Sequence, residues 1–222
     1  MERSLSKYID HTILKAFAGK NEIETLCNDA KKYDFASVCI NPSNIPLAKK
    51  LLAGTDVKVC TVIGFPLGAN TTAIKVAETE DALKMGCDEF DMVINVGALK
   101  DKRDDYVRDE IRAVVKAAQG RLVKVIIETF FLNDEEKVRA VKLSCEAGAS
   151  FVKTCTGFND GKATVDDVRL MKANATNGVQ VKASSGIRTW NDAKALIDAG
   201  AERLGTSSGA TILAEYENSE KS

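Results

Sequence analysis

Two lysines stand near the ends of short apolar segments that read as strands. Residues 151–157 are FVKTCTG and residues 179–186 are VQVKASSG, so Lys153 and Lys182 are each followed by small hydroxyl residues and glycine. Lysine is depleted in strands and costly to bury, so each needs a reason to be there. A lysine amine of lowered pKa forms a Schiff base with a carbonyl compound. The pair therefore indicates amine chemistry, provided that the fold brings the two side chains together.

The electrostatics of such a pair would favour this chemistry. A free lysine has a pKa of about 10.4 and is a poor nucleophile near neutral pH. A second ammonium about 4 Å away, at an effective dielectric constant near 20, costs roughly 4 kcal/mol, which corresponds to about three pKa units. Lys182 would thus lower the pKa of Lys153. The alternative is that each lysine ends a strand and pairs with an acidic residue.

Apolar segments alternate with amphipathic ones along the chain. Residues 103–119 give the clearest helix, since apolar side chains recur on one face. Residues 122–127 are almost continuously apolar, as in a strand that is buried on both faces. The predicted strands are residues 9–10, 35–40, 57–63, 88–95 and 122–127, the segments that carry Lys153 and Lys182, and residues 203–205.

Eight strands that alternate with helices predict an α/β fold, a single (β/α)8 TIM barrel of residues 1–222. An open parallel sheet is the alternative. The last residues, about 215–222, are polar and are expected to form a mobile tail. Asn133 and Glu136 are expected to cap a helix.

A repeated step from helix to strand supports the barrel. Three predicted helices end in a glycine, which suits the left-handed cap of a helix. Five residues after Gly86, Gly148 and Gly200 come Asp91, Lys153 and Gly205, and Lys182 follows Gly178 by a step one residue shorter. These positions are expected at the carboxyl ends of their strands, the face that carries the active site in such barrels.

Two carboxylates are candidates to work with the lysines. Asp91 would hold an ammonium or move protons through a water molecule, and the alternative is a salt bridge inside the barrel. Asp10 ends the first predicted strand, and the alternative for it is a helix cap. His11 is the only histidine, which leaves almost no room for a catalytic triad or a histidine metal cluster, and we expect it on the surface or in packing.

The loops after the last two predicted strands are rich in glycine and serine. Residues 186–188 are GIR and residues 205–209 are GTSSG. In barrels of this type, these loops and a helix N-terminus commonly bind phosphate through backbone N–H groups and the helix dipole. Two such loops indicate a phosphorylated substrate.

Composition excludes several classes of function. The chain has 222 residues and a net charge of −1 without a block of like charges, so we expect no nucleic-acid or membrane partner. It has no signal peptide and no apolar run of membrane-spanning length, which predicts a cytoplasmic protein. The six cysteines include no C-x-x-C pair, which argues against a zinc site and predicts reduced, buried thiols.

Six motifs together resemble the deoxyribose-phosphate aldolases of the DeoC family. They are residues 9–12 (IDHT), 61–68 (TVIGFPLG), 91–99 (DMVINVGAL), 151–158 (FVKTCTGF), 181–189 (VKASSGIRT) and 203–209 (RLGTSSG). The resemblance extends from about Leu5 to Leu213. It implies a class I aldolase that reversibly splits 2-deoxy-D-ribose 5-phosphate into acetaldehyde and D-glyceraldehyde 3-phosphate, without a metal or another cofactor.

The resemblance also implies roles for individual residues. Lys153 would form the Schiff base, Lys182 would perturb its pKa and assist proton transfer, and Asp91 would be the general acid and base. The residues that would contact the sugar are Asp10, Thr12 and Thr156. Those that would surround the phosphate are Gly157, Ser185, Gly186, Arg188, Gly205, Ser207 and Ser208. The expected partners are a sugar phosphate and aldehydes, and the expected assembly is a homo-oligomer, a dimer or a tetramer.

The chain departs from the family pattern at two places. Residues 184–186 read SSG where the family usually has SGG, so the extra hydroxymethyl group of Ser185 would crowd the phosphate or add a donor. The chain also ends without the terminal tyrosine that some relatives have, so proton transfer by a tail is not expected. The alternatives are a Schiff-base lyase or transferase for another sugar phosphate, and a non-catalytic sugar-phosphate binder.

Overall fold

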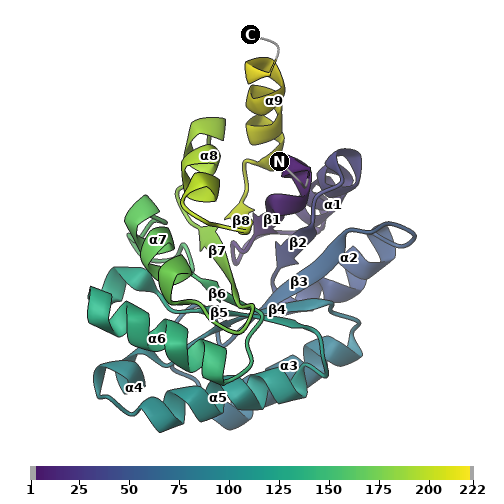
Figure 1. Ribbon diagram of the computed structural model, residues 1–222. Coiled ribbons are helices and arrows are strands. Elements are labelled where there is room, and N and C mark those ends of the chain that lie inside the picture. The colour runs from purple at the N-terminus through teal and green to yellow at the C-terminus, as the bar shows by residue number, and fades with distance from the viewer. Residues whose placement is uncertain (1–3, 221–222) are drawn as a thin grey trace.

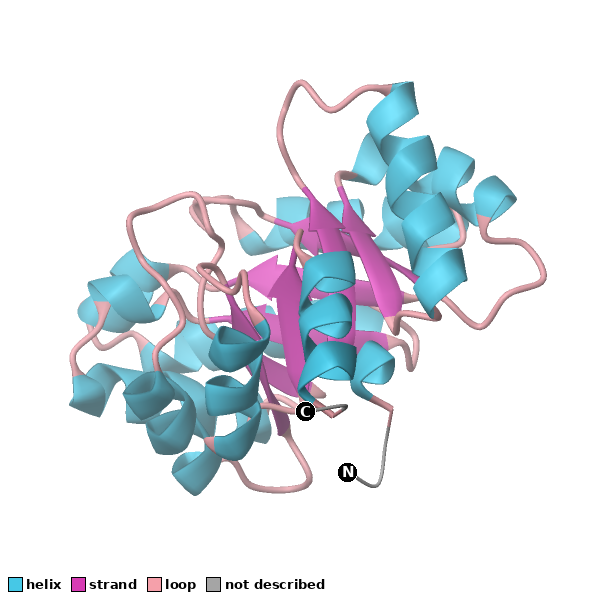
Figure 2. Cartoon of the chain, turned by 90° about the horizontal axis from the view of Figure 1, so that it is seen from above, coloured by secondary structure: helices cyan, strands magenta, loops and turns pink. Residues whose placement is uncertain are grey.

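Eight parallel strands close into a barrel in the computed structural model, which describes residues 4–220. The strands follow one another around the barrel in chain order, and β1 pairs with β8 to close it. The predicted (β/α)8 barrel is therefore confirmed and the open sheet is excluded. Figure 1 shows the chain passing around this ring, and Figure 2 shows the helices lying outside the strands.

The strands are short and lie close to the predicted segments. Their bounds are β1 Ile9–Ile13, β2 Ser37–Ile40, β3 Lys58–Ile63, β4 Glu89–Val93, β5 Leu122–Ile126, β6 Phe151–Lys153, β7 Gln180–Ser184 and β8 Arg203–Thr206. Asp91 and Lys182 lie in the middle of β4 and β7, and only Lys153 ends its strand. The prediction that these three residues and Gly205 lie at strand ends is thus wrong for Asp91 and Lys182, because the glycine step marks the helix end and not the strand end. Gly205 is one residue from the end of β8.

Helices cover the outside of the barrel. Their bounds are α1 Lys20–Tyr33, α2 Ile45–Leu51, α3 Thr72–Lys84, α4 Val96–Lys100, α5 Asp104–Ala117, α6 Asp134–Glu146, α7 Val165–Asn174, α8 Trp190–Asp198 and α9 Gly209–Ser219. Three 3₁₀ helices, η1 Leu5–Tyr8, η2 Pro42–Asn44 and η3 Thr129–Phe131, complete the elements. None of the helices in the described part of the chain is long and apolar enough to cross a membrane.

Local capping explains several helix starts. Asn133 accepts a hydrogen bond from the backbone N–H of Glu136 and Glu136 returns one, which confirms the predicted cap of α6. Thr189 and Asp192 form the same capping box at α8. Helix α4 was not predicted, because five residues are too few to show a helical period; its cap is Asn95, which accepts from the N–H of Ala98.

The expected polar tail is mostly helical. Residues 215–219 form the end of α9, and residues 221–222 lie outside the described part of the chain. Tyr216 packs against the core and lies edge-on to the ring of Trp190, with 4.9 Å between the ring centroids. Glu215 accepts a hydrogen bond from the backbone N–H of Trp190 at 2.7 Å. These contacts with α8 hold a segment whose own sequence is polar, so the prediction of a tail from residue 215 is wrong for this stretch.

The loop between β3 and α3 is anchored by a lysine that is fully buried. Lys75 donates hydrogen bonds to the carbonyls of Gly68 and Val93 and to Glu110, each at 2.8 Å. Gly68 has φ +66°, and a Cβ atom there would lie 2.0 Å from the carbonyl oxygen of Ile94. The glycine lets the loop approach β4, and the ammonium of Lys75 then ties the two backbones together.

The core has two parts of opposite character. Apolar side chains such as Val38, Phe90 and Val181 are fully buried and belong to the main hydrophobic cluster. The inside of the barrel instead holds charged side chains that bond to one another from different strands. Small barrels usually fill this space with branched apolar residues. The charged interior is therefore the candidate location of the active site.

Candidate active site

One carboxylate binds three lysines at the centre of the barrel. Asp91 Oδ2 accepts hydrogen bonds from Lys153 Nζ and Lys182 Nζ, both at 2.7 Å, and Asp91 Oδ1 accepts one from Lys124 Nζ at 2.9 Å. Lys153 and Lys182 are register partners on the neighbouring strands β6 and β7. The structure thus brings the two predicted lysines together, and Asp91 lies between them.

A second set of ion pairs surrounds this centre. Asp10 pairs with Lys182 at 2.6 Å through Oδ2, and through Oδ1 it accepts from Arg203 at 2.6 Å and from Ser37 at 2.7 Å. Glu89 pairs with Lys124 at 2.7 Å and with Arg203 at 3.4 Å. Asp10 therefore belongs to the barrel interior as a strand residue, and the alternative that it caps a helix is wrong.

These contacts fix the ionisation of the cluster. Burial opposes the charge on Asp91, but the fields of Lys124, Lys153 and Lys182 outweigh it and hold the pKa of Asp91 well below its ordinary value. In the same way, burial is outweighed at Lys182 by Asp10 and Asp91, which raise the pKa of Lys182. Lys182 is therefore an ammonium at neutral pH, as a charged neighbour of Lys153 must be.

The charges of the cluster do not balance. The four cationic side chains Lys124, Lys153, Lys182 and Arg203 face the three carboxylates of Asp10, Glu89 and Asp91. Release of one proton from an ammonium would leave the cluster neutral. Of these four cations, all within the described residues, only Lys153 lines the cavity above the cluster.

The cavity has a volume of about 810 Å³ and opens at the carboxyl ends of the strands. Asp10, Asp91 and Lys182 lie beneath it, and most of the other predicted site residues line it. Those that line it are Thr12, Lys153, Thr156, Gly157, Ser185, Gly186, Arg188, Gly205 and Ser207. Among the predicted site residues, all of which are described, Ser208 alone belongs neither to the lining nor to the cluster; its N–H donates to Thr206 Oγ1 at 2.9 Å.

Gly205 leaves room for Lys182. A Cβ atom at Gly205 would lie 2.9 Å from Ser184 Cβ and 3.2 Å from Lys182 Cε. Any side chain there would push the lysine away from Asp10 and Asp91. Gly205 was predicted as a phosphate contact. The structure shows a second reason for glycine at this position, which is the space that the side chain of Lys182 needs.

Ser185 holds the β6–α7 loop. It has φ +79°, a left-handed conformation that costs a serine more than a glycine. Its hydroxyl donates to the carbonyl of Gly161 at 2.8 Å, and its carbonyl accepts from the N–H of Ala163 at 3.1 Å. Because the hydroxyl proton is committed to Gly161, Ser185 fastens the loop and does not offer that proton to a ligand.

Lys124, Glu89 and Arg203 were not predicted as part of the site. Lys124 interrupts the apolar strand β5, which is the same signal in the sequence that singles out Lys153. Arg203 and Glu89 begin their strands, and nothing in their local sequence shows that the barrel brings them into contact. Glu128, a buried carboxylate after β5, was missed for the same reason.

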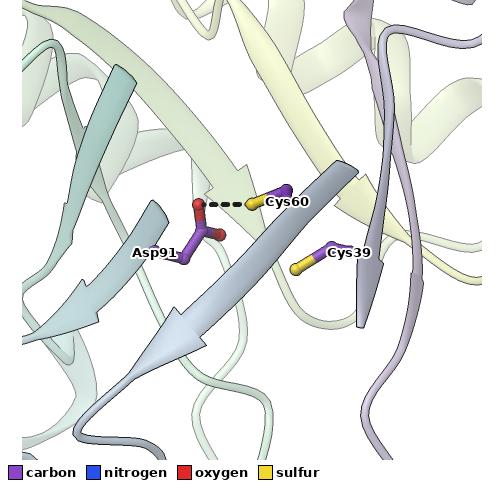
Figure 3. A group of neighbouring side chains, drawn as sticks. All are labelled: Cys39, Cys60 and Asp91. Carbon is purple, nitrogen blue, oxygen red and sulfur yellow. Dashed lines mark hydrogen bonds between the residues drawn. The ribbon is translucent and has the colours of Figure 1, made fainter. Parts of the chain in front are cut away.

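Two cysteines lie beside Asp91 at the centre of the barrel (Figure 3). The donor atoms of Cys39, Cys60 and Asp91 lie within 4.8 Å of one another, a spacing that a metal ion could bridge. The Cys60 thiol, however, donates to Asp91 Oδ1 at 3.2 Å and accepts from Lys124 at 3.3 Å. Burial, with Cys39 and Asp91 nearby, raises the pKa of Cys60 well above its ordinary value. Both oxygens of Asp91 already accept hydrogen bonds from ammonium groups. We therefore interpret Cys39 and Cys60 as thiols within a hydrogen-bonded cluster and not as metal ligands. All six cysteines are described, buried and unpaired, as predicted.

His11 packs inside the fold. It is 5% exposed, its ring centroid lies 5.0 Å from that of Phe35, and its Nε2 lies 3.8 Å from Asp29 Oδ2. Burial lowers the pKa of His11. The imidazole borders the cavity, but it makes no bond with the lysine cluster among the described residues. Of the two expected places, the surface or the packed interior, His11 therefore lies in the packed interior.

Comparison with known proteins gives one consistent family. The family model of DeoC/LacD aldolases matches residues 5–215. A deoxyribose-phosphate aldolase of Dictyoglomus turgidum is 58% identical over 209 residues, which cover 94% of this chain and 95% of the relative. One from a Geobacillus species is 58% identical over 214 residues and 96% of each chain. The structure of a deoxyribose phosphate aldolase from Aeropyrum pernix superposes with a TM-score of 0.87 at 34% identity, over 96% of this chain and 91% of the other.

The buried carboxylates predict how stability depends on pH. The pKa of Asp10 is held below its ordinary value of 3.8: burial opposes ionisation, but Arg203, Lys182 and Lys124 outweigh it. The unfolded chain therefore takes up a proton near pH 3.8 while the folded chain does not, so this stabilisation is present above that pH and is lost as the pH falls. Asp10→Asn removes the titration, and its free energy of unfolding should fall between pH 5 and pH 3 by about 1 kcal/mol less than that of the wild type.

Urea unfolding at the two pH values measures this difference. Asp10→Asn should also be less stable at pH 7, because Lys182 and Arg203 lose a charged partner in a buried site. The control is Asp34→Asn, which removes an exposed carboxylate paired with Lys7 at 2.6 Å. If the free energy of unfolding depends on pH equally in Asp10→Asn and in the wild type, the lowered pKa assigned to Asp10 in the folded chain is wrong.

Proposed function

The chain belongs to the DeoC/LacD family of aldolases, and we propose that it reversibly cleaves 2-deoxy-D-ribose 5-phosphate to acetaldehyde and D-glyceraldehyde 3-phosphate through a Schiff base on Lys153. One observation carries the assignment of the lysine. Lys153 lines the cavity, whereas Lys124, Lys182 and Arg203 are enclosed by carboxylates beneath it. We also propose that residues 1–222 act as one aldolase domain.

Imine formation begins at Lys153 Nζ. Its ammonium releases a proton, and the cluster then becomes neutral, with Lys124, Lys182 and Arg203 balanced by three carboxylates. The free amine attacks the aldehyde carbon C1 of the open-chain sugar, and the resulting carbinolamine loses water to give the imine. Lys182 contributes a fixed positive charge that disfavours a second ammonium next to it.

Cleavage then breaks the bond between C2 and C3. The C3 hydroxyl loses its proton, C3 becomes the aldehyde of D-glyceraldehyde 3-phosphate, and the bonding electrons pass through C2 to the iminium nitrogen to form an enamine. Protonation at C2 and hydrolysis release acetaldehyde and restore the lysine. Asp91 lies 2.7 Å from both Lys153 and Lys182, so it exchanges protons with them and, through water, with the substrate.

The phosphate fits the loops after β7 and β8. Gly186, Arg188 and Ser207 line the cavity on these loops, and helix α9 begins two residues after Ser207. Backbone N–H groups and the N-terminal end of a helix favour an anion, and the guanidinium of Arg188 adds a positive charge. Thr12 and Thr156 line the part of the cavity that the sugar would occupy.

The assembly and cellular location complete the proposal. The aldolase from Aeropyrum pernix, 34% identical to this chain, is described as tetrameric. We propose a homo-oligomer, a dimer or a tetramer, that works in the cytoplasm on small sugar phosphates and aldehydes. Sedimentation analysis of the purified protein distinguishes these assemblies from a monomer.

Trapping of the imine tests the role of Lys153. Incubation with acetaldehyde and borohydride should leave one ethyl group on Lys153, detected by peptide mass mapping. Lys153→Ala should abolish this adduct and should reduce turnover by a factor of about 10⁴ or more, because the covalent route is lost. An exposed lysine, Lys20, serves as the control, and Lys20→Ala should retain both. Persistent trapping on another lysine of Lys153→Ala would refute the assignment.

Two substitutions of Lys182 separate charge from proton transfer. Lys182→Leu removes the fixed charge that disfavours the Lys153 ammonium, so the rising limb of the pH profile for imine trapping should move up by about one pH unit or more. Lys182→Arg keeps the positive charge, but arginine stays protonated and so does not take part in proton transfer. It should retain most of the trapping rate near neutral pH and still impair turnover. Trapping by Lys182→Leu at pH 7 that is as fast as in the wild type would show that the charge of Lys182 is not what activates Lys153.

A charge placed on the β8–α9 loop tests the phosphate site. Ser207→Asp should raise the KM for 2-deoxy-D-ribose 5-phosphate by about tenfold or more through repulsion of the anion, with little effect on unphosphorylated 2-deoxy-D-ribose. Thr176→Asp is the matched control, since Thr176 is exposed in the α7–β7 connection at the opposite end of the barrel. Equal effects of Ser207→Asp on both sugars would place the phosphate elsewhere.

A further inference from the structure

Glu128 is a buried carboxylate beside the cavity that has no part in the reaction steps above. It lies two residues after β5, is 2% exposed and has φ +56°. A left-handed backbone is uncommon for a residue other than glycine, asparagine or aspartate, and such positions cluster at functional sites. If this position had to form only a turn, glycine would adopt the left-handed backbone at lower cost. The presence of a carboxylate here therefore needs an explanation.

The carboxylate holds the loop that follows Lys153. Glu128 Oε2 accepts hydrogen bonds from Thr156 Oγ1 at 2.6 Å and from Asn159 Nδ2 at 3.2 Å. The backbone N–H of Thr156 donates to both carboxylate oxygens at 3.3 Å. Thr156 lines the cavity and Glu128 does not. Glu128 therefore acts on a bound substrate through the loop that it holds, in which Thr156 both bonds Glu128 and lines the cavity.

The Thr156 hydroxyl has a fixed polarity as a result. A hydroxyl carries one proton and two lone pairs. Its proton goes to Glu128, and one lone pair accepts from the backbone N–H of Phe158 at 3.2 Å. One lone pair is left for the cavity. Thr156 can therefore accept a hydrogen bond from a ligand there but cannot donate one.

We propose that Glu128 is a positioning residue that fixes this polarity, and that the site thereby selects substrates that present a hydroxyl group to Thr156. The inference rests on the proposed function, since it takes the ligand to be a sugar phosphate. D-Glyceraldehyde 3-phosphate carries one free hydroxyl, next to its carbonyl carbon, and this hydroxyl donates to Thr156. A phosphorylated aldehyde without that hydroxyl leaves the lone pair unmatched, and sites built to bind a hydroxyl discriminate against such analogues.

The test compares two acceptor aldehydes in condensation with acetaldehyde. One is D-glyceraldehyde 3-phosphate, and the other is 3-phosphooxypropanal, which lacks the hydroxyl. The ratio of their kcat/KM values should favour the hydroxylated acceptor in the wild type. Glu128→Met removes the acceptor oxygens and should reduce this ratio by about tenfold or more. Glu128→Gln keeps an oxygen where Thr156 donates, so it should retain most of the preference.

Matched variants distinguish this role from a structural one. Glu136→Met removes a glutamate of the α6 capping box that is not part of the cavity lining, and it should leave the ratio unchanged. Thr156→Val should reduce the ratio as Glu128→Met does, and Thr156→Ser should keep it. If Glu128→Met lowers kcat/KM equally for both acceptors, or if Thr156→Val keeps the preference, the inference is wrong; the second result decides the question even if Glu128→Met does not fold.

Imine trapping distinguishes failure of the proposed function from failure of the role of Glu128. Borohydride trapping of acetaldehyde on Lys153 does not require the acceptor, so Glu128→Met should retain it. Absence of trapping in the wild type would refute the proposed function. Normal wild-type trapping and cleavage, with an unchanged acceptor ratio in Glu128→Met, would refute only the role of Glu128.

Discussion

The sharing of Asp91 by three lysines is the interaction on which the rest of the site depends. The carboxylate is fully buried, and its partners come from β5, β6 and β7. A buried charge is tolerated only when it is paired and hydrogen-bonded, and the loss of one partner from such a pair typically costs about 3–5 kcal/mol. The register of the barrel and the ionisation of its interior are therefore coupled, because these lysines meet only if the strands pair as they do.

The imbalance of charge in the cluster links its structure to reactivity. Asp10 and Glu89 bind Lys124, Lys182 and Arg203, which do not line the cavity, whereas Lys153 pairs with Asp91 alone among the described residues. Lys153 is at the boundary, 3% exposed and in contact with the space where a carbonyl compound would bind. Asp91 keeps Lys124 and Lys182 as charged partners apart from Lys153, and Lys153 is the one of the three that lines the cavity.

Two strained residues hold the loop that carries Thr156. Glu128 and Ser185 both have left-handed backbone conformations without being glycine, and they bond the β6–α7 loop at Thr156 and Gly161 respectively. Each gives its loop a side-chain bond that glycine could not make. The cost of the strained backbone is offset by a more fixed position for groups that line the cavity, as is expected where substrate geometry matters.

Local sequence patterns were enough to predict the alternation of strands and helices, the barrel, the family, and Lys153, Lys182 and Asp91 as a group. These follow from local periodicity, from lysines placed in apolar strands and from short motifs. Other features became visible only in the folded chain: Lys124, Glu89 and Arg203 complete the cluster, Gly205 makes room for Lys182, Ser185 binds Gly161, and residues 215–219 are helical. Those features arise from contacts between residues far apart in the chain. Asp10 and Arg203, for example, come into contact because the barrel closes by pairing β1 with β8. A periodic pattern records which face of an element is buried, but it does not record which side chain from another strand meets it there.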